Sequence, residues 1–103
     1  MLTMTCDVVP GKAYTILGTV MGAYVNSKNI GHDIGASLKT IVGGELKSYT
    51  KMMDEARAHA FGKMEEQAAA MGADAVIAVK ICSSAIIQGA SEILVYGTAI
   101  KWS

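Results

Sequence analysis

The chain has 103 residues, of which 51 % are hydrophobic and only 17 % charged, and its nine basic and nine acidic residues cancel. This length suits a single domain spanning residues 1–103, and a neutral chain has no basic field to attract nucleic acid. No apolar run approaches the roughly 18 residues of a membrane-spanning helix, and the start lacks a basic and then apolar secretory signal. We therefore expect a cytoplasmic protein with neither membrane nor nucleic-acid partners.

The first part of the chain is predicted to form one long strand and one short helix. Residues 1–12 allow a brief edge strand before the turn at Val9-Pro10-Gly11. Residues 13–25 are rich in β-branched and aromatic residues, and we expect Gly18 and Gly22 to mark a bulge or a close backbone approach. After a polar break at 26–29, apolar residues at helical spacing predict the short helix: Ile30, Ile34, Leu38 and Ile41.

The chain is organised around a long helix predicted over about residues 45–71, after a break at Gly43-Gly44. Charged residues fall mainly on one side of this helix, and Gly72 can take the left-handed conformation that ends it. The other side carries residues that recur at spacings of three and four and predict a buried stripe: Tyr49, Met53, Ala56, Ala60, Met64, Ala68 and Met71.

Two further strands are predicted after Gly72, over residues 73–87 and 92–102, joined as a hairpin by a turn at 88–91. The element order strand, helix, helix, strand, strand indicates an α+β fold. We expect the helices to pack on one face of a small, mostly antiparallel sheet.

The predicted strands are apolar on both faces, whereas a sheet with one wet face should alternate apolar and polar residues. By simple alternation, Val76 and Ala78 face one way while Ile77, Val79 and Ile81 face the other. In the last strand, Leu94, Tyr96 and Ile100 oppose Ile93, Val95 and Ala99. One long and one short helix cover only one face, so we expect a second copy of the chain to cover the other.

The two cysteines are candidate metal ligands with a simpler structural interpretation. Cys6 and Cys82 lie far apart without C-x-x-C spacing, which favours buried, reduced thiols over a disulfide or a zinc motif. Cys82 stands beside Ser83-Ser84, where the apolar pattern weakens, and a soft-metal ligand is the alternative there.

The two histidines are the other candidates. His32 and Asp33 open the short helix, but adjacent helical side chains diverge, so a polar first turn is favoured over a base or a metal ligand. His59 shares the solvated helix face with Glu55 and Lys63, and since the H-E-x-x-H pattern is absent, an ordinary surface pair is favoured.

The remaining motifs predict structure rather than chemistry. The seven methionines suggest soft-metal binding, yet Met53, Met64 and Met71 lie on the predicted stripe, which favours core filling. Gly43-Gly44 precedes a helix as a phosphate loop would, but the G-x-x-x-x-G-K-[ST] motif is absent and Glu45 places negative charge at that point. No Ser/His/Asp or Cys/His set can be assembled, so we predict no catalytic residue.

An ordered set of short motifs runs through essentially the whole chain: Ile41-Val42-Gly43-Gly44, Tyr49, Ala56-Arg57, Met71-Gly72-Ala73-Asp74-Ala75-Val76 and Gly97-Thr98-Ala99. This set resembles the YbjQ family of small bacterial proteins. The resemblance implies a dodecin-like subunit, with a curved, mostly antiparallel sheet wrapping the long helix, assembled into a ring as a homopentamer. The family is labelled heavy-metal-binding and its molecular function is otherwise uncharacterised. It supplies no His or Cys motif to match here, and Arg57, off the stripe, is free to pair with an acid in its own or a neighbouring subunit.

Three functions stay open on these grounds. The first is a ring-forming homo-oligomeric binding or assembly module, whose partner is another copy of the chain. The second is a heavy-metal-binding protein, with a soft or transition metal held by Cys6, His32, His59 or Cys82 from several subunits. The third, ranked last, is an enzyme with an interface active site containing His32 or Cys82.

Overall fold

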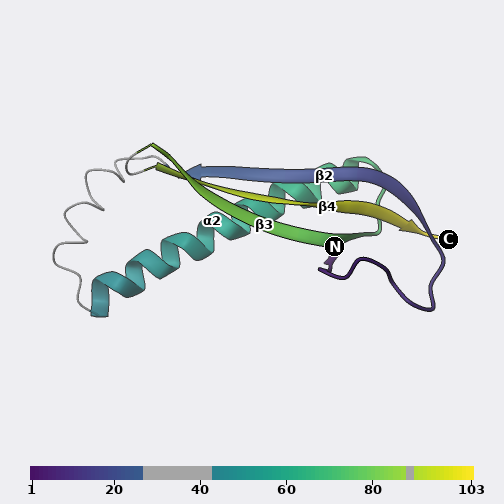
Figure 1. Ribbon diagram of the computed structural model, residues 1–103, viewed down its shortest axis with the longest axis horizontal. Coiled ribbons are helices and arrows are strands. Elements are labelled where there is room, and N and C mark those ends of the chain that lie inside the picture. Colours follow the sequence, from purple (N-terminus) through teal and green to yellow (C-terminus); the bar gives the residue numbers. More distant parts are fainter. Residues whose placement is uncertain (27–42, 88–89) are drawn as a thin grey trace.

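The computed structural model describes residues 1–26, 43–87 and 90–103, with the backbone alone at 26, 43–49, 84–87 and 90–91. One helix packs against a four-stranded sheet and runs diagonally across it (Figure 1). The elements are β1 (Leu2–Thr3), β2 (Tyr14–Asn26), α2 (Gly43–Ala70), β3 (Ala75–Ile87) and β4 (Ala90–Trp102). The predicted α+β class is confirmed, and the predicted short helix around Ile30 to Ile41 lies outside the described residues.

The strands lie in the order β1-β3-β4-β2. β4 pairs antiparallel with both β2 and β3, which confirms the predicted hairpin, whereas the short β1 pairs parallel with β3. The sheet is therefore mixed rather than purely antiparallel. The brief edge strand expected before Pro10 is present as β1, and β4 begins at Ala90, two residues before the predicted start at Glu92.

The helix ends as its sequence predicts. Gly72 has a φ of +80°, and its amide donates to the carbonyl of Ala69 at 3.0 Å while the amide of Ala73 donates to that of Ala68 at 3.0 Å. This pair of bonds is the Schellman motif, in which a left-handed glycine satisfies the last helical carbonyls. The turn that follows sends the chain directly into β3.

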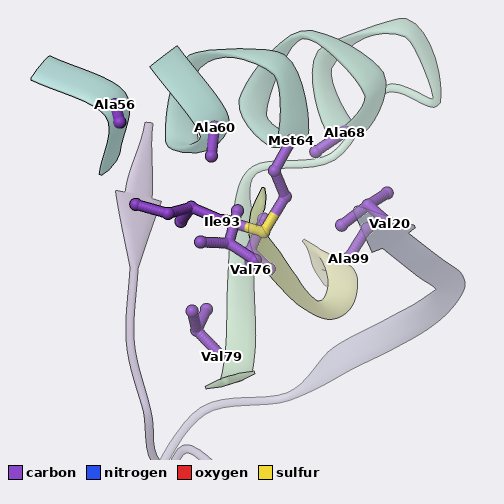
Figure 2. Close-up of a cluster of buried hydrophobic side chains, with 10 residues drawn as sticks. Val20, Ala56, Ala60, Met64, Ala68, Val76, Val79, Ile93 and Ala99 are labelled. Atoms are coloured by element: carbon purple, nitrogen blue, oxygen red, sulfur yellow. The ribbon is translucent and has the colours of Figure 1, made fainter. Parts of the chain in front are cut away.

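The core lies between α2 and the sheet (Figure 2). From the predicted stripe, the helix contributes Ala56, Ala60, Met64 and Ala68, all buried, and Met53 packs half-buried against them. The prediction for Met71 is wrong: its side chain is 40 % exposed, because the helix stops one residue before it. The sheet completes the core with Val20, Val76, Val79, Ile93, Val95 and Ala99.

Two of the three register shifts in the described strands decide which residues of β2 and β3 face the core. The register of β2 with β4 shifts between Ile16 and Gly18, where Gly18 has a φ of +146°, as expected for one of the two glycines in this strand. A second shift lies in β3 at Ala78, which has a φ of +54°. As a result Val76 and Val79 both join the core, and the prediction from simple alternation that they face opposite ways is wrong.

Candidate functional site

The face of the sheet turned away from α2, here called the open face, is apolar and partly uncovered. Strand pairing places on this side Tyr14, Ile16, Thr19, Met21, Ala23, Val25, Ala75, Ile77, Lys80, Cys82, Glu92, Leu94, Tyr96, Thr98, Ile100 and Trp102. Its exposed fractions are 65 % at Ile16, 50 % at Met21, 48 % at Val25 and 36 % at Tyr96. This surface is the candidate functional site of the chain.

One end of the open face is covered by the chain itself. Ala75, Ile77 and Ile100 are buried there beneath the N-terminal segment, which contributes Met4 and Val9. The segment runs past this end of the sheet before it enters β2 (Figure 1). The expectation that the chain encodes no second layer is therefore wrong for this end. In the other half of the face, the described residues leave Met21, Val25 and Tyr96 exposed.

The covered end is closed by an aromatic cluster that the sequence analysis missed. The rings of Tyr14 and Trp102 meet edge to face at 6.3 Å between centroids, and Lys12 Nζ lies 4.7 Å from the centre of the Trp102 ring. Asp74 Oδ2 accepts a 2.8 Å hydrogen bond from the Trp102 amide and lies 3.9 Å from Lys101 Nζ. The sequence offered one indication of this cluster, which is the only tryptophan of the chain at the end of the last predicted strand.

The outer edge of β2 is held by the helix at one point. The Met21 amide donates a 2.7 Å hydrogen bond to Oε1 of Gln67, a side chain of α2. Gln67 therefore reaches past the last strand of the sheet and occupies a backbone donor that points away from β4. The sequence carried no signal for this contact, since Gln67 falls among the residues of the polar helix side.

The predicted thiol ligands are exposed rather than buried, so the expectation of buried thiols is wrong. Cys6 lies in the N-terminal segment, where its carbonyl accepts a 2.7 Å bond from the Ala78 amide, and Cys82 lies on the open face of β3. They belong to different parts of the surface and are not brought together.

The predicted histidine ligands do not join them. The ring of His59 stacks on Tyr24 at 4.8 Å, with Lys63 Nζ 5.8 Å from the Tyr24 centroid, instead of pairing with Glu55. Its predicted place on the exposed helix side is confirmed, and His32 lies outside the described residues. Among the residues described, no three His, Cys, Asp or Glu side chains form a group able to hold a metal ion.

Arg57, which the sequence left free to pair within or between subunits, pairs with Asp54 one turn earlier on its own helix. Within the described ranges, no helix combines the length and the apolar character that crossing a membrane requires.

Comparisons with known proteins agree with this reading of the fold. A YbjQ family model, described as "Putative heavy-metal-binding", matches residues 1–103. A UPF0145 protein of Thermosipho melanesiensis is 54 % identical over 98 % of this chain and 94 % of its own length. A UPF0145 protein of Thermotoga maritima is 50 % identical over 98 % of this chain and 96 % of its own.

A solved structure shares the fold. It is a protein of unknown function from Pediococcus pentosaceus, assigned in its title to the DUF74 family, with a TM-score of 0.71. The superposition covers 100 % of this chain and 98 % of that one at 18 % identity, so it supports the architecture of the subunit alone.

Proposed function

The chain belongs to the YbjQ family, and on that premise we propose that it serves as a homo-oligomeric binding or assembly module, its copies packed through the open face into a ring of five. The observation that carries the proposal is the uncovered apolar half of that face, where Met21, Val25 and Tyr96 remain exposed beside fully buried core strands. Apolar patches of this kind on a small domain mark interaction sites.

The free energy gained by burying the open face is large enough to support a stable assembly. If each copy hid about 400 Å² of apolar surface, the transfer from water would contribute about 10 kcal/mol at ~25 cal/mol per Å², before the cost of association. That value compares with the whole stability of a small domain, about 5 to 15 kcal/mol. A copy of the same chain is the simplest supplier of a matching apolar face, and any ligand would then bind where subunits meet.

Native mass spectrometry of untagged protein, purified without chelator, tests this proposal. We expect a single fivefold mass at micromolar concentration. A different closed number would retain the module and correct the ring size. A monomer under the same conditions would contradict the proposal, because the open face would then be stable in water.

A second candidate function, heavy-metal binding, is favoured by the description of the family model. The described residues of one chain do not form a metal centre. In an oligomer, each copy contributes one exposed Cys82 thiol, so several thiols can come together. They lie on the open face, which the first proposal places between subunits. Thiolates are the ligands that soft metals prefer, so we infer that any such site is shared between copies and built from Cys82.

Cadmium titration tests the metal proposal, because cadmium thiolate bonds absorb in the ultraviolet. We expect the absorbance to saturate at less than one ion per chain and to disappear in Cys82→Ser. Cys6→Ser is the matched control, since this exposed thiol lies in the N-terminal segment, and it should bind as the parent does. Equal loss in both variants, or no absorbance at all, would contradict a shared Cys82 site.

A further inference from the structure

The sheet has two edges that the described residues of its own chain leave partly unpaired. β2 is the last strand of the order β1-β3-β4-β2, and in the described part of the chain the Gln67 bond at Met21 is the only hydrogen bond along its outer edge. The outer edge of β3 is covered as far as Val79 by residues 2–6, through bonds such as Val79 amide to Met4 carbonyl. From Lys80 onward the described backbone of β3 has β4 alone as its neighbour.

The unpaired stretches of β2 and β3 lie opposite the same residues of β4. Leu94 of β4 is paired with Ala23 on one side and Cys82 on the other, and Ile93 is likewise flanked by Tyr24 and Ser83. Both strands run antiparallel to β4 and are therefore parallel to each other. A second copy set beside the first in the same orientation would bring its β3 against β2 at the correct height and in the parallel sense.

The residue composition of both edges favours pairing with another strand over exposure to water. The thirteen residues of β2 include neither a charged residue nor a proline, two of the devices by which edge strands prevent association, and the bulge at Gly18 lies before the stretch in question. Beyond Met21, Val25 is exposed on this strand. The corresponding stretch of β3 carries one charge, Lys80, within an otherwise uncharged sequence.

The helix supplies a second, independent match. α2 lies so close to β2 that Gly22 touches its backbone, and Gln67 extends beyond that edge. Ile81 of β3 faces the helix side of the sheet, since it pairs with the core residue Val95, yet it is 52 % exposed. A neighbouring β3 placed next to β2 would carry its Ile81 beneath the overhanging flank of the helix, where it would be buried.

We infer that residues 23–26 of β2 pair in parallel with the stretch of β3 beginning at Lys80 in the next copy, so that the sheet continues from subunit to subunit. The inference rests on the proposed homo-oligomer and adds to the packing of its open faces a second contact, along the strand edges. The contact joins two different edges, so it is head-to-tail and repeats until the assembly closes. A two-fold β2 to β2 contact would leave Ile81 and the β3 edge in water.

Native Cys82 provides the test, because it lies on the open face of β3 with the same orientation as Ala23 and Val25 of β2. In a Cys6→Ser background, Ala23→Cys and Val25→Cys each place a second thiol on the pairing edge. Neighbouring strands lie ~4.8 Å apart, within disulfide reach. Under mild oxidation we expect intersubunit disulfides in at least one of the two variants, lost when Cys82→Ser is added.

Matched control variants test whether the cross-links report the proposed pairing of β2 with β3. Ile16 also lies on the open face and is more exposed than Val25, but it lies at the end of the sheet where the β3 edge is covered, so Ile16→Cys should not cross-link to Cys82. Mixing Ala23→Cys/Cys82→Ser chains with chains that carry Cys82 alone should give cross-linked pairs with one chain of each kind.

The possible failures can be told apart by native mass. A disulfide that persists in Ala23→Cys/Cys82→Ser alone would show β2 beside β2 and overturn the inference. An intact oligomer without cross-links in either variant would also overturn it, while leaving the proposed module in place. A monomer would overturn both.

Discussion

Gly22 of β2 lies directly against the backbone of Ala60 in α2, with no room for a side-chain carbon between them. A Cβ at position 22 would overlap the Ala60 carbonyl oxygen and lie 2.5 Å from the amide nitrogen of Met64. The alanine stripe of the helix and the glycine of the strand therefore let the two backbones touch. This contact sets the distance between the helix and the sheet.

Gly22→Ala should consequently destabilise the fold strongly, since backbone atoms on both sides must move. We expect a loss of at least about 3 kcal/mol in the free energy of unfolding, measured by urea denaturation. Gly62→Ala is the matched control. Gly62 lies in α2, and a Cβ at this position would meet nothing within 4 Å. Alanine there should leave the free energy of unfolding unchanged or raise it by up to ~1 kcal/mol. Similar losses in both variants would contradict this account.

Among the side chains whose burial the structure describes, Met64 is the largest that is fully buried, and it lies in the core between α2 and the sheet (Figure 2). Met64→Ala should leave a cavity and cost about 2 to 5 kcal/mol in unfolding free energy. Met71→Ala removes the same atoms at a partly exposed position and should cost less than Met64→Ala, about 1 kcal/mol. Thermal and urea unfolding of the two variants, compared with the parent, would check the difference. Equal effects would show that the core lies elsewhere.

Asp74 ties the end of β4 to the turn before β3 through its bond from the Trp102 amide. Asp74→Ala leaves that amide without its charged acceptor, and we expect a loss of about 1 to 2 kcal/mol. Lys101→Ala removes only the exposed 3.9 Å ion pair with the same carboxylate and should change stability by less than ~0.5 kcal/mol. The two unfolding curves would separate the backbone bond from the ion pair, and a larger effect at Lys101 would reverse their roles.

Val25 and Val8 are both exposed valines, but only Val25 lies on the open face. Val25→Glu should break the proposed assembly into smaller species, because the new carboxylate would be buried between subunits directly opposite Glu92, which carries the same charge. Val8→Glu makes the same chemical change in the N-terminal segment and should leave the native mass unchanged. Circular dichroism on both would confirm that the subunit still folds. An intact assembly in Val25→Glu would place the contact elsewhere.

The helix and the strand pairing were largely predictable because they depend on local periodicity. Ala56, Ala60, Met64 and Ala68 define one side of a helix whatever surrounds them, and Gly72 is suited to end it. Face assignments in β3 were not predictable, since Ala78 adopts a positive φ that nothing in an alanine indicates. A single bulge of this kind moves every later side chain to the opposite face.

The sequence predicted a second apolar face of the sheet, but not how much of that face is exposed. Apolar residues on both sides of β4 indicated a second apolar face, yet the cover that Met4 and Val9 give to Ile77 depends on the path of an irregular segment. The exposure of Cys6 and Cys82 was missed for a similar reason, because burial depends on neighbours distant in sequence. Composition gives only an average tendency for a thiol to lie inside.

The bond from Met21 to Gln67 has a consequence for the newly made chain before it meets another copy. Segments of about six or seven uncharged residues with exposed backbone are those that stack into amyloid. The thirteen residues of β2 are interrupted by the bulge at Gly18 and again at Met21, where the helix occupies the amide. Neither Thr19–Val20 nor residues 22–26 reaches that length. We therefore expect the Gln67 bond to hinder fibril growth along β2 while leaving residues 22–26 available for pairing.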